Sequence, residues 1–119
     1  MDVYVFDIIA TPTPLSLEYG ILQCAYVDIW VYDSSREGAE IKAQSHLMDL
    51  GWKWFLLEKE LVLNDEEIDQ YREDAQANYY QAKQEGISVC FMAEMESNSN
   101  LLEVLVLQDP VLPVSVSHN

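Results

Sequence analysis

The segment between residues 65 and 74 carries the densest cluster of acidic side chains in the sequence. It contains a single basic residue, Arg72, among six carboxylates. These are Asp65, Glu66, Glu67, Asp69, Glu73 and Asp74. In a helix, Glu66, Asp69 and Glu73 lie at positions i, i+3 and i+7 and therefore share one face. A surface of this kind can meet a basic protein, a divalent cation or only water.

The helix dipole accounts for part of this cluster, because a carboxylate in the first turn is stabilised by about 0.3–1 kcal/mol. It does not account for Glu73 and Asp74, which repel each other unless a cation or a basic partner lies nearby. The sequence therefore predicts a partner-binding surface formed by Glu66, Asp69, Glu73 and Asp74. The alternative interpretation is a solvated helix face with no partner.

Asp28 is the second position with chemical potential, because it interrupts an apolar strand pattern over residues 21–32. A carboxyl group buried there without a partner would have a raised pKa, and such groups often mark functional sites. Asp28, Trp30 and Trp54 form our candidate pocket for a small molecule or a simple enzymatic reaction. Two alternatives stay open: Asp28 lies on a wet face, or it accepts a hydrogen bond from a Tyr or Trp side chain. The aromatic residues themselves also suit a core or an interface.

Other catalytic and metal sites find little support. A single acidic helix face offers too few converging oxygens for Mg²⁺ or Ca²⁺, and no EF-hand loop is present. The two histidines are His46, on a predicted helix, and His118, near the end of the chain. A nucleophile pair between Cys24 and His46 would need a positive charge to stabilise the thiolate, and this region is poor in bases. No G-x-S-x-G elbow, P-loop or dinucleotide fingerprint occurs. We expect no metal and no cofactor.

Charge restricts the classes of partner. The chain has 119 residues with 21 acids, six bases and a formal net charge of −15. Nucleic acids and anionic membranes would repel such a protein, whereas a basic protein would be attracted; solubility alone is the simpler alternative. Cys24 and Cys90 fall in apolar runs, and we expect them to be buried thiols of a reducing compartment. The first residues lack the positive and apolar regions of a secretory signal, so we expect a cytoplasmic location.

Periodicity predicts five strands and two helices in the order ββαβαββ. The strands cover residues 2–10, 21–32, 52–63, 87–96 and 101–108; the helices cover 35–50 and the segment from Asn64 to Gly86. Capping boxes at Ser34 with Glu37, and at Asn64 with Glu67, indicate the two helix starts. Gly51 and Gly86 indicate the two helix ends.

One domain over residues 1–119 suits this length, with 109–119 as an extended or mobile tail. The simplest α+β arrangement is a two-layer sandwich, with both helices on one face of a mixed or antiparallel sheet of about five strands. In architecture alone it resembles the broad ferredoxin-like group, which implies no activity. The other sheet face is too apolar to meet water, and we therefore expect a homodimer. The function expected is a small acidic, non-enzymatic interaction or regulatory protein.

Overall fold

The computed structural model describes residues 1–96 as one α+β unit. Its elements are β1 (Asp2–Pro12), β2 (Leu22–Asp33), α1 (Arg36–Asp49), β3 (Trp52–Leu63), α2 (Asp65–Ile68), α3 (Glu73–Glu85) and β4 (Ile87–Glu96). The predicted strand over 101–108 and the predicted tail over 109–119 lie outside the described residues. The α+β class is confirmed, with four antiparallel strands and three helices in the described part.

The four strands form one antiparallel sheet in the order β3-β1-β2-β4. β1 and β2 occupy its centre and are rich in β-branched and aromatic residues, which suit a pleated surface. Both strands are apolar on both faces, as expected for strands that are covered from two sides. In the register of this pair Val5 lies opposite Trp30, and Asp7 lies opposite Asp28. This register decides which side chains can form a site.

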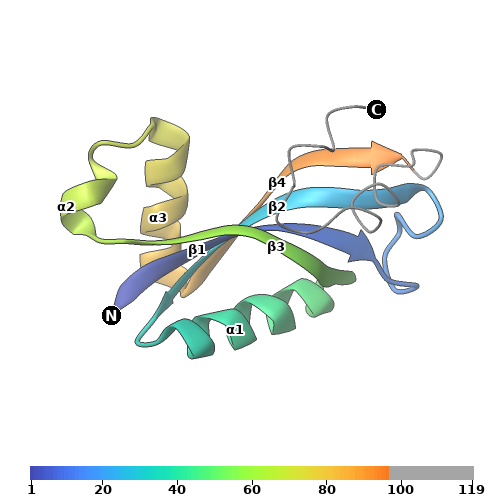
Figure 1. Ribbon diagram of the computed structural model, residues 1–119, viewed down its shortest axis with the longest axis horizontal. Helices are drawn as coiled ribbons and strands as arrows, with labels where there is room; N and C mark the ends of the chain where they lie inside the picture. Colours follow the sequence, from blue (N-terminus) through green and yellow to red (C-terminus); the bar gives the residue numbers. More distant parts are fainter. Residues whose placement is uncertain (97–119) are drawn as a thin grey trace.

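Helix α1 covers one face of the sheet (Figure 1). Ala39, Ala43 and Leu47 lie one or two turns apart and are fully buried against the odd-numbered side chains of β2. The small alanines allow the helix to approach the strands closely. Its N-cap is Ser35, whose Oγ accepts a hydrogen bond from the backbone N–H of Gly38. The predicted cap at Ser34 is therefore one residue too early, because Asp33 Oδ1 already accepts from the Ser34 and Ser35 N–H groups.

Helices α2 and α3 cover the opposite face at one end of the sheet (Figure 1). Ile68 and Tyr79 are buried there with Val3 and Val5 of β1. The single helix expected between Asn64 and Gly86 is therefore wrong in one respect, since residues 69–72 separate two helices. Its expected ends are confirmed: Asn64 forms the capping box with Glu67, and Gly86 adopts a left-handed φ of 94°.

The break between α2 and α3 has a physical reason. Asp65 Oδ1 accepts hydrogen bonds from Tyr79 Oη and Lys83 Nζ, each at 2.7 Å. Asp65 and Tyr79 are 14 positions apart, a separation that an unbroken helix would stretch to about 21 Å. Folding α2 back against α3 is what brings these groups together.

The placement of the helices on opposite faces corrects the expected two-layer sandwich. Local periodicity shows which side of a helix is buried, but it does not show which face of the sheet receives it. The ferredoxin-like arrangement expected from sequence has both helices on one face, and the described part departs from it. None of the helices within residues 1–96 is long and apolar enough to cross a membrane.

Candidate functional site

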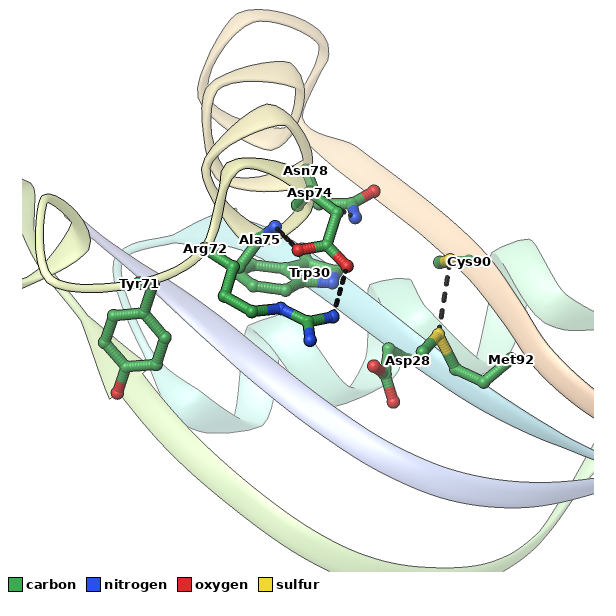
Figure 2. Close-up of a pocket in the computed structure, with 9 residues that line it drawn as sticks. All are labelled: Asp28, Trp30, Tyr71, Arg72, Asp74, Ala75, Asn78, Cys90 and Met92. Carbon is green, nitrogen blue, oxygen red and sulfur yellow. Dashed lines mark hydrogen bonds and ion pairs between the residues drawn. The ribbon is translucent and has the colours of Figure 1, made fainter.

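A pocket lies where the first turns of α3 meet strands β2 and β4 (Figure 2). We call it the α3 pocket, and its volume is about 260 Å³. Its lining residues are Asp28 and Trp30 of β2, Tyr71 and Arg72 of the turn before α3, Asp74, Ala75 and Asn78 of α3, and Cys90 and Met92 of β4. It is a partly open hollow with a polar floor and a mixed rim.

The floor of the pocket continues as a polar row across the sheet. Asp28 lies directly opposite Cys90 on β4 and opposite Asp7 on β1, and Asp7 in turn lies opposite Lys59 on β3. Directly opposed residues point to the same face. The neighbouring positions on this face are apolar, including Val5 and Ile9. A row with two facing carboxyl groups is therefore unusual in this sheet and calls for an explanation.

The carboxyl group of Asp28 is the most strongly perturbed acid of the row. Burial raises its pKa to about 7, and the hydrogen bond and the charge of Asp7 act in the same direction. Lys59 opposes this shift. Glu58, the extra residue of a bulge in β3, also has a raised pKa, first through burial and then through the charge of Asp7. Around neutral pH, the carboxyl group of Asp28 is therefore about half protonated.

Trp30 supplies an unpartnered donor to the same pocket. Its side chain is 6% exposed, and its Nε1–H has no hydrogen-bond acceptor among the described residues. Figure 2 shows the indole nitrogen at the edge of the ring that faces the space between Asp74, Asp28 and Met92. A buried donor left without an acceptor costs about 1–3 kcal/mol. Native proteins seldom keep such a group unless water or a ligand satisfies it.

The rim of the pocket holds its polar groups in place through internal contacts. Arg72 Nη2 donates to Asp74 Oδ2 at 3.0 Å, and the Ala75 N–H donates to Asp74 Oδ1 at 2.9 Å. Ser88 Oγ donates to Asn78 Oδ1 at 2.7 Å. These rim groups already have partners, in contrast to the Trp30 indole. Arg72 is 84% exposed and can also reach a ligand at the mouth of the pocket.

The acidic residues expected to bind a partner lie along the α2–α3 turn. Glu66 belongs to α2, Asp69 is its C-cap, and Glu73 and Asp74 form the first turn of α3. All four are exposed. The break after α2 means that Glu66, Asp69 and Glu73 do not follow one helical repeat. Within residues 1–96, Asp74 is the member of this set that forms an ion pair, with Arg72.

Of the expected pocket residues, the structure brings Asp28 and Trp30 together and places Trp54 elsewhere. Trp54 packs edge-on against Phe6 on the α1 face, with 5.5 Å between the ring centroids. Sequence reasoning missed Asp7, Arg72, Asn78 and Cys90 as neighbours of Asp28. The available signal for Asp7 was that each central strand has one acid in its middle. Arg72, Asn78 and Cys90 could not be found in this way, because only the tertiary fold brings them to Asp28.

The remaining candidates do not form a second site. Cys24 is buried on the α3 side of the sheet, and burial raises the pKa of its thiol to about 11. His46 sits on α1, on the other side of the sheet, so a nucleophile pair with Cys24 is excluded. Over residues 1–96, no group of three His, Cys, Asp or Glu side chains is arranged to hold a metal ion.

Comparisons of this chain with protein-family models, with curated proteins and with solved structures find no match.

Proposed function

We propose that this protein is an interaction module that binds a basic protein surface through the acidic α2–α3 turn. The observation that carries the proposal is the set of exposed carboxylates at Glu66, Asp69 and Glu73, for which residues 1–96 provide no ion pair. A basic partner would relieve their mutual repulsion and would be steered toward them by the net charge of −15.

The distribution of basic residues supports this interpretation. Four of the six Lys and Arg residues form ion pairs with acids other than Glu66, Asp69 and Glu73. Arg36, for example, contacts Glu40 and Glu60 at the start of α1. Within residues 1–96, Glu66, Asp69 and Glu73 are therefore left without an ion-pairing base.

A charge-reversal experiment with a matched control tests the proposal. The probe is a synthetic peptide rich in Lys and Arg, titrated calorimetrically at low and at physiological ionic strength. One variant carries Lys in place of Glu66, Asp69 and Glu73. The control carries Lys at three exposed acids elsewhere: Glu37, Asp49 and Glu94. Both variants change the net charge equally.

We expect the turn variant to weaken peptide binding by roughly tenfold or more at low salt, because three exposed charge pairs contribute about 0.5 kcal/mol each and reversal adds repulsion. The control should weaken it only slightly, and salt should reduce the difference. Equal losses in both variants would mean that net charge alone attracts the peptide, and the proposal would fail.

A homodimer and a cytoplasmic location also remain proposals. The homodimer was expected from an apolar sheet face without a helix, and helices on both faces remove much of that reason. Its present support is β3, which pairs only with β1 among residues 1–96 and therefore offers a long edge. Light scattering on the purified protein tests the dimer.

The cytoplasmic location is supported by the two free cysteines in the described fold.

A further inference from the structure

We propose that the α3 pocket binds a free α-amino acid with an apolar side chain, holding its carboxylate at Trp30 and its ammonium group at Asp28. The inference does not depend on the basic partner, although Asp74 belongs both to the acidic turn and to the pocket. It depends on the pocket, on an unpartnered buried donor and on a carboxyl pair whose groups lie on the same sheet face.

The carboxylate end of the ligand is assigned by the Trp30 indole. Its Nε1–H is buried and lacks an acceptor within the described fold, and the indole to which it belongs lines the pocket (Figure 2). Only a group with a lone pair can satisfy it. Arg72 stands at the rim and can add a second, charged donor to the same carboxylate. An ammonium or guanidinium group alone has no lone pair and would leave the indole unsatisfied.

The ammonium end is assigned by the carboxyl pair of the floor. Asp28 faces the pocket and is opposed by Asp7, so a cation placed there neutralises the repulsion between the two. Asp74 stands above the same space. A wholly anionic ligand such as phosphate would meet three carboxyl groups. A ligand that carries both a cation and an acceptor oxygen can bind Asp28 through the cation and accept a hydrogen bond from the Trp30 indole through the oxygen.

The spacing of the two anchors fits the head group of an amino acid. Asp28 and Trp30 are two positions apart on β2, so their Cα atoms are roughly 7 Å apart. An α-amino acid carries its nitrogen and its carboxylate on one carbon. Because both side chains line the same pocket, one ligand can form a hydrogen bond of about 2.9 Å with each of them.

The size and the walls of the pocket limit the remainder of the ligand. A volume of about 260 Å³ lies below the roughly 300–1,000 Å³ of pockets for drug-sized molecules. Nucleotides and peptides of several residues are therefore too large. Met92, Ala75 and Tyr71 offer apolar surface beside the polar floor, and Met92 is a side chain that adapts well to different shapes. These walls select an apolar amino-acid side chain.

The test follows the indole N–H signal of Trp30 by NMR, assigned through the backbone, while L-leucine is added. Three analogues test the two anchors separately. N-acetyl-L-leucine lacks the ammonium group that Asp28 would hold. Leucinol lacks the carboxylate that Trp30 would hold, and isoamylamine lacks any oxygen acceptor for the Trp30 indole. We expect L-leucine to shift the Trp30 signal in a saturable manner. Each analogue should bind at least about tenfold more weakly, because each loses a charged hydrogen bond.

Two variants complete the experiment. Asp28→Asn preserves the shape of the side chain and should abolish the saturable shift, whereas Glu94→Gln, on an exposed part of β4, should leave it unchanged. The proposal is overturned if no apolar amino acid shifts the Trp30 signal at millimolar concentration. Equal binding of L-leucine and all three analogues, or unaltered binding by Asp28→Asn, would overturn it as well. Because the residues of the acidic turn are untouched, failure here leaves the basic-partner proposal standing.

Discussion

Replacement of Asp28 by asparagine should stabilise the protein at pH 8 and change its stability little at pH 4. The pKa of Asp28 rises from 3.8 to about 7, because the carboxylate is half-buried and faces Asp7. Over this range the folded protein retains a proton that the unfolded chain has lost. The unfolded state therefore binds fewer protons, and the free energy of unfolding falls as pH rises from about 4 to about 7. Above pH 7 the penalty is constant.

The expected magnitude follows from the same shift. A change of about three pK units corresponds to about 4 kcal/mol at 1.36 kcal/mol per unit. Asp28 is partly exposed to solvent, which screens its interactions, so we expect about 2 kcal/mol. The asparagine side chain of the Asp28→Asn variant keeps the shape of the original without its charge and should recover this amount at pH 8.

Urea unfolding of the wild type and of the variant at pH 4, 6 and 8 measures the difference. The charged groups that face Asp28 are Asp7 on β1, Lys59 on β3, and Arg72 and Asp74 at the start of α3. Asp7→Asn should also stabilise the protein at pH 8, but less, because the burial of Asp28 remains. A variant that is equally stable or less stable than the wild type at every pH would refute the assignment of the shifted proton to this pair.

The remaining predictions concern binding and packing. L-Leucine should bind about tenfold more tightly at pH 8 than at pH 6, because the ionised fraction of Asp28 rises with pH through a pKa of about 7; a flat profile in titrations would contradict the role of this carboxylate. Leu47→Ala should lower the free energy of unfolding by about 3 kcal/mol, because the side chain is fully buried between α1 and the sheet; a loss below about 1 kcal/mol in urea would contradict the packing. Asn64→Ala should cost about 1 kcal/mol through loss of the capping box, while thermal unfolding of Asn64→Asp should show most of that stability retained. Tyr79→Phe should cost about 1 kcal/mol by removing the hydrogen bond to Asp65, and no change in unfolding would argue against that contact.

The four strands within residues 1–96 and most helix ends could be predicted from the sequence because their signals are local. The apolar run over residues 21–32 correctly indicated a strand at the centre of the sheet. Asn64 with Glu67, and Gly86, correctly marked two helix ends. The break before α3 was missed because Ile68, Ala75 and Tyr79 keep a helical spacing through it. Only the contact that folds α2 onto α3 reveals that the helix is interrupted.

The candidate site was predicted only in part, because it depends on pairing between distant segments. Asp28 and Trp30 share a face by strand alternation alone, which the sequence shows. Trp54 was wrongly grouped with them, since bulges in β3 and the fold around β1 decide its face. The pairing of Asp7 with Asp28 depends on the register of β1 and β2, and the long loop between these strands leaves that register open from sequence alone.

The α3 pocket is built almost entirely by one continuous stretch of chain. Seven of its nine lining residues lie between Tyr71 and Met92, and only the floor belongs to β2. Local unfolding of that stretch would erase the cavity while β1, β2, β3 and α1 keep their own contacts. An occupant of the pocket would oppose such opening, so amide hydrogen exchange in α3 and β4 should slow when the cavity is filled. Occupancy of the α3 pocket can therefore stabilise the segment from Tyr71 to Met92. The same segment carries Glu73 and Asp74 of the acidic turn.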